Sequence, residues 1–246
     1  MKGKIRILAM LGWLIAAGAA AGCLILFQSL QEVLAREQRL RQSTAGLENR
    51  TSHTRISNKP LVLITGDSRA AQLGEAPLGD FAVVNRGVPG QTTIEVLARI
   101  GRDMAVSRPD HVIVIAGVND LKQGELSSEE MAAIVRSFEE MLLIGDAMGI
   151  PVTVCPIWGA SSKPTLRGFA LPSNLDGYVR DANQLLRAVA EEKGADIANA
   201  DPLLDEKGLV RESLSSDALH LNAAGQEVLR KLLLESIDSN DGSDSD

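Results

Sequence analysis

A serine that could act as a nucleophile lies directly after a short apolar stretch. Residues 61–65 read Leu-Val-Leu-Ile-Thr, which predicts a buried strand, and Gly66-Asp67-Ser68 follows as a turn. In an open α/β sheet, ligands bind beyond the carboxyl ends of the strands, so Ser68 is well placed to attack a substrate. A helix cap is the commoner reason for Asp and Ser after a strand. The functional interpretation therefore requires a base and an oxyanion hole elsewhere in the chain.

The search for a base is short because the chain has three histidines. His53 lies in a polar linker, and His111 opens an apolar strand at the edge of the sheet away from Ser68. His220 lies in a loop just before the last predicted helix, with Asp217 three residues earlier. A carboxylate at that spacing can orient the imidazole and stabilise its charged form. His220 with Asp217 is therefore the partner that the sequence offers to Ser68.

Two further turns at strand ends could supply an oxyanion hole. The turn from Gly87 to Gly90 can expose a backbone N–H group, with Gly90 the better candidate because it follows Pro89 and precedes a helix. Asn119 ends the third predicted strand at the same edge, and its side-chain amide can donate. Ordinary turn chemistry explains each of these residues equally well when it is taken alone.

The elements that must position these residues alternate between strand and helix. The five predicted strands are residues 61–65, 81–85, 111–116, 151–155 and 195–198. The predicted helices begin near residue 70, at Thr92 or Thr93, and at residues 127, 175 and 223; the last ends at Ile237, and residues 159–173 form a long loop. This alternation predicts an α/β fold, a three-layer α/β/α sandwich with a five-stranded parallel sheet.

Four short blocks, in this order, resemble the SGNH (GDSL-like) hydrolase family. They are Gly66-Asp67-Ser68, Asn85-x-Gly87-x-x-Gly90-x-Thr92, Gly117-x-Asn119-Asp120 and Asp217-x-x-His220-Leu221-Asn222. Each block falls at a predicted strand end or in a loop before a helix, and the match covers about residues 60–237. The resemblance implies a flavodoxin-like sheet, an acyl-enzyme mechanism and no cofactor.

The resemblance also implies a role for each matched residue. Ser68 is similar to the nucleophile, with its own N–H group in the oxyanion hole, and Gly90 and Asn119 resemble the other two donors. His220 is similar to the general base, oriented by Asp217. Arg69 departs from the apolar residue that many relatives carry, and it either faces solvent, forms a salt bridge or favours an anionic substrate at the pocket. Trp158 is either a core residue or a wall of the acyl site.

The N-terminal segment predicts a membrane helix. Residues 7–27 carry no charge and follow Lys2, Lys4 and Arg6, and 21 helical residues span about 30 Å, the thickness of a bilayer core. A signal anchor, with the domain on the extracytoplasmic (periplasmic) side of the cell (inner) membrane, is favoured over a cleaved signal peptide that would give a secreted protein. A lipoprotein cut before Cys23 is the third alternative, but the apolar run continues past that cysteine. The expected organisation is an anchor at 1–27, a stalk and linker at 28–58, an SGNH domain at 59–237 and a disordered acidic tail at 238–246.

The composition excludes several other kinds of site. A formal net charge of −7 and a pI near 5.1 argue against a nucleic-acid partner. Aromatic residues make up only 3% of the chain, so the composition does not indicate a surface on which sugars or bases would stack. Cys23 lies in the apolar run and Cys155 at a strand end, so no disulfide is expected between them. The sequence has no cysteine and histidine spacing typical of a structural zinc site, and it does not identify protein partners.

Three functions are compatible with this pattern. The first is a membrane-anchored serine esterase that hydrolyses an acyl ester of a glycan or a lipid. The second is an O-acyltransferase that passes the acyl group to an envelope polysaccharide instead of water. The third is a non-catalytic SGNH-like binding module, which would have no need for Ser68, Asn119 and His220 together.

Overall fold

The computed structural model describes residues 59–241, with the side chains of 166–167 and 239–241 left out. The predicted anchor, the stalk and linker with His53, and Cys23 lie outside the described residues, as do residues 242–246. Within residues 59–241, no helix has both the length and the apolar character needed to cross a membrane. The described residues therefore include the whole predicted SGNH domain, 59–237.

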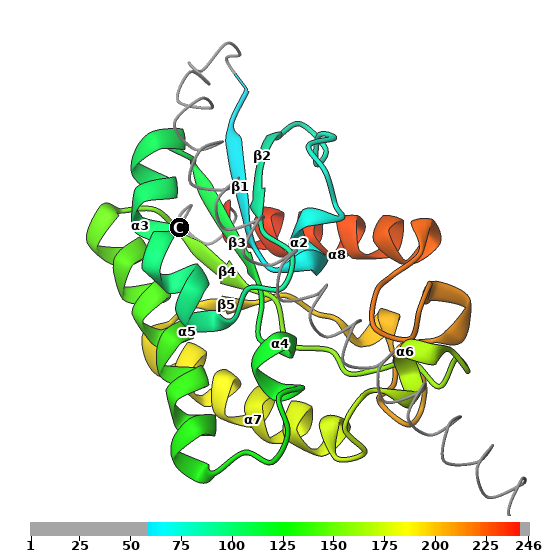
Figure 1. Ribbon diagram of the computed structural model, residues 1–246. Coiled ribbons are helices and arrows are strands. Elements are labelled where there is room, and N and C mark those ends of the chain that lie inside the picture. Colours follow the sequence, from blue (N-terminus) through cyan, green and yellow to red (C-terminus); the bar gives the residue numbers. More distant parts are fainter. Residues whose placement is uncertain (1–58, 242–246) are drawn as a thin grey trace, which may run out of the picture. The chain divides into compact units, whose positions relative to one another are not determined.

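A five-stranded parallel sheet forms the centre of the fold, as the sequence predicts (Figure 1). Its strands are β1 (Leu61–Gly66), β2 (Ala82–Gly87), β3 (His111–Ile115), β4 (Val152–Val154) and β5 (Asp196–Ile197). The strand order is β2-β1-β3-β4-β5, and every adjacent pair is parallel. In this flavodoxin-like order β2 is added on one side of β1, and β3 to β5 are added on the other side. Ligands bind at this switch point between β1 and β3, beyond the carboxyl ends of the strands.

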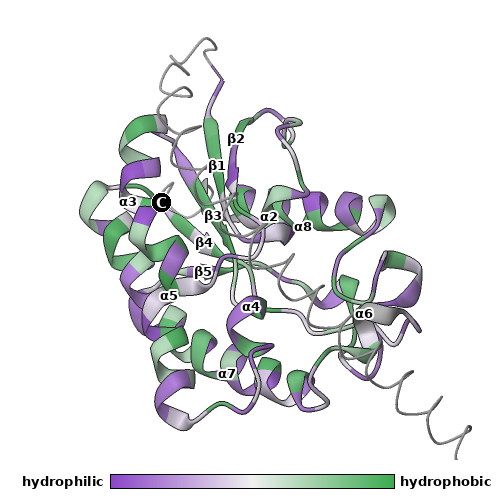
Figure 2. Cartoon of the chain, in the orientation of Figure 1, coloured by the Kyte–Doolittle hydropathy of each residue, from purple (hydrophilic) through white to green (hydrophobic). Residues whose placement is uncertain are grey.

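Helices cover both faces of the sheet. Successive side chains of a strand point to opposite faces, and both sets are largely apolar in the central strands. Leu63 faces one cluster of buried residues, which includes residues of α3, α5 and α7. Val62 and Ile64 face a second cluster, which includes residues of α2 and α8. These helices are α2 (Ser68–Ala71), α3 (Thr93–Ser107), α5 (Ser128–Met148), α7 (Leu175–Lys193) and α8 (Ala223–Asp241). The central stretches of β1 and β3 are accordingly hydrophobic on both faces, whereas the helices alternate in hydropathy (Figure 2).

Several element boundaries differ from those expected. Residues 159–173 are not all loop, because a short helix, α6 (Leu166–Phe169), forms within them. The final helix continues four residues past the expected end, to Asp241. The remaining elements are α4 (Val118–Leu121) and the 3-10 helices η1 (Asp201–Leu203) and η2 (Glu212–Leu214).

The strand ends next to Ser68 pack closely enough to require glycine. Gly66 has φ of +142°, and a Cβ atom there would lie 1.8 Å from the carbonyl oxygen of Ile115. A Cβ atom on Gly87 would lie 2.2 Å from the backbone nitrogen of Ala71. These contacts press the ends of β1, β2 and β3 and the helix α2 against one another. The nucleophile turn is thus fixed by backbone packing.

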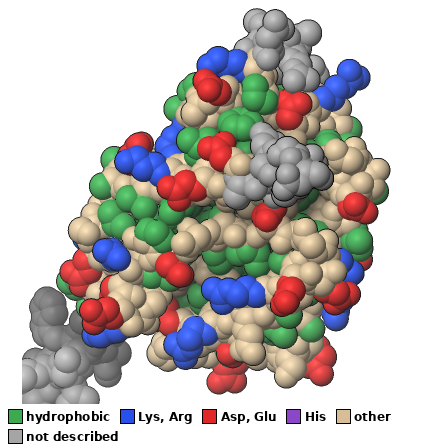
Figure 3. Space-filling model, turned by 180° about the vertical axis from the view of Figure 1, so that it is seen from behind, with side chains coloured by type: hydrophobic (Ala, Val, Ile, Leu, Met, Phe, Trp, Pro, Cys, Tyr) green, Lys and Arg blue, Asp and Glu red, His purple; other side chains and the backbone are tan. Residues whose placement is uncertain are grey.

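The surface opposite the view of Figure 1 carries charges of both signs. Acidic and basic side chains are interspersed there among apolar ones (Figure 3). A nucleic-acid surface instead gathers Lys and Arg along one stripe. The face seen in Figure 3 carries no such basic stripe.

Candidate active site

The turn after β1 makes Ser68 the first residue of helix α2. Asp67 is the N-cap, and its Oδ1 accepts a hydrogen bond from the backbone N–H group of Arg69 at 2.8 Å. Burial raises the pKa of Asp67 to about 6, although the charge and the N–H group of Arg69 act in the opposite direction. The cap holds the start of the helix, so it also holds the Ser68 side chain at the carboxyl edge of the sheet.

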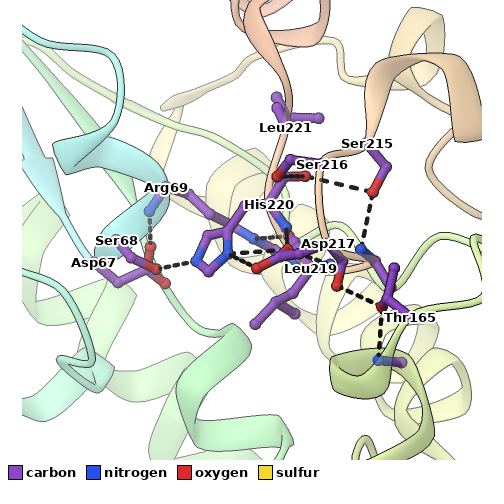
Figure 4. Close-up of polar contacts among 12 residues, drawn as sticks. Asp67, Ser68, Arg69, Thr165, Ser215, Ser216, Asp217, Leu219, His220 and Leu221 are labelled. Atoms are coloured by element: carbon purple, nitrogen blue, oxygen red, sulfur yellow. Dashed lines mark hydrogen bonds and ion pairs between the residues drawn. The ribbon is translucent and has the colours of Figure 1, made fainter.

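The structure brings Ser68, His220 and Asp217 into one hydrogen-bonded chain (Figure 4). Ser68 Oγ lies 2.9 Å from His220 Nε2, and His220 Nδ1 lies 2.9 Å from Asp217 Oδ2 and 3.1 Å from Asp217 Oδ1. Burial raises the pKa of Asp217, but hydrogen bonds from His220 outweigh it, so that the pKa lies below the usual value. An ionised carboxylate therefore faces the imidazole at neutral pH, in the arrangement that nucleophilic serine catalysis uses.

The loop before α8 is built around the Asp217 carboxylate. Its Oδ1 accepts hydrogen bonds from the backbone N–H groups of Leu219 at 3.1 Å and His220 at 2.8 Å. Thr165, in the segment before α6, donates from Oγ1 to the carbonyl oxygen of Asp217 at 3.0 Å (Figure 4). Nothing in the sequence predicts this role of Thr165, because a threonine 52 residues away in a polar loop carries no signal of the contact.

Three donors at the same edge have hydrogens available for an oxyanion. Asn119, 4% exposed, donates from Nδ2 to the carbonyl oxygen of Gln91 at 2.8 Å, which uses one of its two amide hydrogens. The backbone N–H groups of Ser68 and Gly90 donate to no residue of the chain between positions 59 and 241. The N–H group of Val88 donates to the carbonyl oxygen of Gly66 at 2.9 Å, which joins the glycine turn to the nucleophile turn.

Two further sets of contacts, which the sequence does not predict, hold the elements that carry Asn119 and the Gly87–Gly90 turn. The Asp120 carboxylate accepts hydrogen bonds from the backbone N–H group and the hydroxyl group of Thr93, at 2.9 to 3.1 Å. These bonds join α4, which carries Asn119, to the first residue of α3. Burial raises the pKa of Asp120 to about 6, although its hydrogen bonds with Thr93 lower it.

Arg99 makes the second of these sets of contacts. Its guanidinium group donates to the carbonyl oxygen of Gly66 at 3.0 Å and to Gln91 Oε1 at 2.8 Å, and it pairs with Asp103 at 2.5 Å. Arg99 and Asp103 are separated by one helical turn, which is the only sign of this network in the sequence.

Arg69, next to the serine, and Trp158 are both buried. Arg69 neither faces solvent nor pairs with a carboxylate of the described chain: it is 4% exposed, and its guanidinium group donates to backbone carbonyl oxygens. Because it is buried, it is not available to an anionic substrate. Trp158 is 2% exposed and lies beneath the Arg69 guanidinium, so it is a core residue.

The remaining candidates lie away from the site. His111 starts β3 at the opposite end of the sheet, and its Nε2 lies 2.8 Å from Thr153 Oγ1. Cys155 is a buried free thiol. Within residues 59–241, no three or more His, Cys, Asp or Glu side chains gather where they could hold a metal ion.

Comparison with known proteins decides the family. Residues 44–228 match the GDSL-like Lipase/Acylhydrolase family along most of the chain. The chain belongs to this family. The GDSL-like resemblance read from four short blocks is thereby confirmed.

Relatives of the GDSL-like family support the same fold. An acetylxylan esterase of Geobacillus stearothermophilus is 23% identical over 176 residues, which cover 63% of this chain and 71% of the relative. A GDSL-like lipase of Bacteroides thetaiotaomicron has a similar structure, with a TM-score of 0.65 and 18% identity over 82% of this chain and 98% of that one. A variant of an acetyl xylan esterase of G. stearothermophilus has a TM-score of 0.57 and 18% identity over 74% of this chain and 95% of that one.

Proposed function

We propose that this GDSL-like protein is a serine esterase that hydrolyses acyl esters through Ser68, His220 and Asp217. The observation that carries the proposal is the continuous chain of hydrogen bonds, 2.9 Å at each link, from Ser68 Oγ through the imidazole to the carboxylate. A core or cap role requires only one of these contacts. The family supports an acylhydrolase in general, and the residues and substrate are our assignment.

In the proposed reaction, Ser68 Oγ attacks the acyl carbonyl carbon while His220 Nε2 takes the hydroxyl proton. The tetrahedral oxyanion accepts hydrogen bonds from the N–H groups of Ser68 and Gly90 and from Asn119 Nδ2. Collapse of this intermediate breaks the bond to the alcohol oxygen, which takes the proton from His220, and leaves an acyl-enzyme. Water then attacks the acyl-enzyme with His220 again as base, which releases the carboxylic acid and restores the serine.

We further propose that the substrate is an O-acylated glycan with a short acyl group. The relative described as an acetylxylan esterase supports a glycan ester over a lipid ester. The uncharged residues 7–27 support a membrane anchor that holds the domain on the extracytoplasmic side, where envelope glycans lie.

A panel of substrates tests this assignment. The full chain, purified in mild detergent, is expected to hydrolyse p-nitrophenyl acetate faster than the octanoate ester and to release acetate from acetylated xylan. Ser68→Ala should abolish both reactions. Failure of the folded protein to cleave any of these esters would contradict the proposal. If the acetyl group moved from the donor ester to an added glycan, a sugar hydroxyl would attack the acyl-enzyme in place of water, and the chain would be a transferase.

A further inference from the structure

Arg69 is a buried cation whose partners are all backbone carbonyl oxygens. Its Nη1 donates to Trp158 at 2.6 Å, its Nη2 donates to Gly159 at 3.2 Å and to Leu219 at 3.0 Å, and its Nε donates to Leu219 at 3.2 Å. The guanidinium carbon also lies 4.5 Å from the centre of the Trp158 ring. Burial lowers the pKa of Arg69 to about 10, although the nearby charge of Asp67 acts in the opposite direction. The hydrogen bonds and the ring contact offset part of the cost of burying the charge. Arg69 is therefore charged at neutral pH.

The positions of these carbonyl groups link the two halves of the site. Arg69 is the residue after Ser68, and Leu219 is the residue before His220. Two of the guanidinium nitrogens bind the Leu219 carbonyl group, and the N–H group of the same residue donates to Asp217. Figure 4 shows Arg69 extending from the nucleophile turn towards this loop. The arginine thus forms a direct connection between the backbone that carries the nucleophile and the backbone that carries the base.

We propose that Arg69 is a positioning residue that sets the distance between Ser68 and His220. The inference rests on the proposed function, because it assumes that this distance matters for catalysis. A fork of several N–H groups is needed to hold two separate segments at once, and a lysine cannot reproduce it. A displacement of about 1 Å at a reacting pair can cost on the order of 100-fold in rate, so even a small shift of the loop should be measurable.

Arg230 provides a matched control because it makes the same kind of contact elsewhere. Its guanidinium group also donates to three backbone carbonyl oxygens, those of Leu73, Ala76 and Pro77, from helix α8. None of these residues belongs to the proposed catalytic set. If both arginines only stabilised the fold, Arg69→Met and Arg230→Met would have the same kind of effect.

The experiment compares Arg69→Met, Arg69→Lys and Arg230→Met in the full chain in detergent. The kcat and KM for p-nitrophenyl acetate are measured at 10 °C and divided by the folded fraction from circular dichroism, so that destabilised variants still report. We expect Arg69→Met to lower kcat by about 10- to 100-fold with KM within about twofold, and Arg69→Lys to fall in between. Arg230→Met should keep the wild-type kcat. A kcat for Arg69→Met within threefold of wild type would overturn the inference.

A double-mutant cycle separates positioning from general structural support. If Arg69 acts through the base, then adding Arg69→Met to His220→Ala should change the residual rate by less than about threefold. Two independent effects would instead multiply, which would refute the positioning role. Ser68→Ala and His220→Ala test the proposed function separately. If both abolish activity while Arg69→Met does not, only the inference about Arg69 fails.

Discussion

The hydrogen bond between Asp217 and His220 leads to a prediction whose direction depends on the geometry of the loop. In Asp217→Asn, an oxygen is expected at the Oδ1 position, because the backbone N–H groups of Leu219 and His220 both donate there. The new amide NH2 group then faces His220 Nδ1, which lies 2.9 Å from Oδ2 in the wild type. The imidazole must accept this bond, so its proton moves to Nε2, where the ring can no longer take the proton of Ser68.

The expected loss of rate in Asp217→Asn has two sources, the lost negative charge beside His220 and the wrong tautomer of its imidazole. An imidazolium and a carboxylate about 4 Å apart attract each other by about 4 kcal/mol at an effective dielectric constant of 20, and by about 1 kcal/mol in water. Since the Asp217 side chain is 34% exposed, we take about 3 kcal/mol, which corresponds to roughly 100-fold in rate. The wrong tautomer adds to this loss, up to about 10⁴-fold in total by analogy with other serine enzymes. Asp217→Asn should therefore lower kcat/KM by about 10²- to 10⁴-fold.

The assay is hydrolysis of p-nitrophenyl acetate, with Asp205→Asn as the control. Asp205 Oδ1 also accepts hydrogen bonds from two backbone N–H groups, those of Lys207 and Leu209, so the control tests the loss of a similar loop carboxylate. It should keep the wild-type rate. A kcat/KM for Asp217→Asn within fivefold of wild type would refute the reasoning.

Three other predictions concern neighbouring positions. Asn119→Ala should lower kcat by about 10²- to 10³-fold with KM nearly unchanged, because the substitution removes a donor that acts mainly in the transition state. Steady-state kinetics measures kcat and KM, and an unchanged kcat would contradict this prediction. Asp120→Asn should become more stable relative to wild type by about 2 kcal/mol as the pH rises from 4 to 7, because the pKa of Asp120 is raised to about 6 in the folded protein and its ionisation therefore favours the unfolded chain; urea unfolding of both proteins at the two pH values measures this, and a stability difference between them that is the same at both pH values would argue against it. Gly66→Ala should prevent folding or cost more than about 4 kcal/mol, since its Cβ atom would lie 1.8 Å from a carbonyl oxygen; a folded variant with normal thermal unfolding would disprove this.

The sequence predicts elements well where the local signals agree. Helix α5 begins after its N-cap Ser127 and α7 begins at Leu175, at the expected starts, and each helix ends before a glycine, Gly149 and Gly194, in the left-handed conformation. The parallel direction of the strands also follows from the alternation of apolar runs and helices, whereas the flavodoxin-like order of the strands is implied by the family resemblance alone. These features depend on residues close together in the chain.

The contacts that the sequence does not predict join distant residues. Arg69 binds the carbonyl groups of residues 89 and 150 positions away, and any residue can supply such a carbonyl oxygen. From the sequence alone, Arg69 is therefore expected to face solvent, to form a salt bridge or to contact the substrate. In the fold it is buried instead. The sequence also does not predict helix α6, because Gly and Pro in residues 159–173 favour a loop. The helix packs against the loop of Asp217, where a Cβ atom on Gly168 would lie 3.2 Å from Ala218 Cβ.

The most direct test of the central claim is labelling with a fluorophosphonate, which forms a covalent bond with an activated serine. The full chain in mild detergent is compared with Ser68→Ala and His220→Ala, and the labelled residue is located by peptide mass spectrometry. We predict one label on Ser68 in the wild type, none in Ser68→Ala, and slow labelling in His220→Ala. A folded wild type that takes up no label, or that is labelled on another residue, would contradict the account.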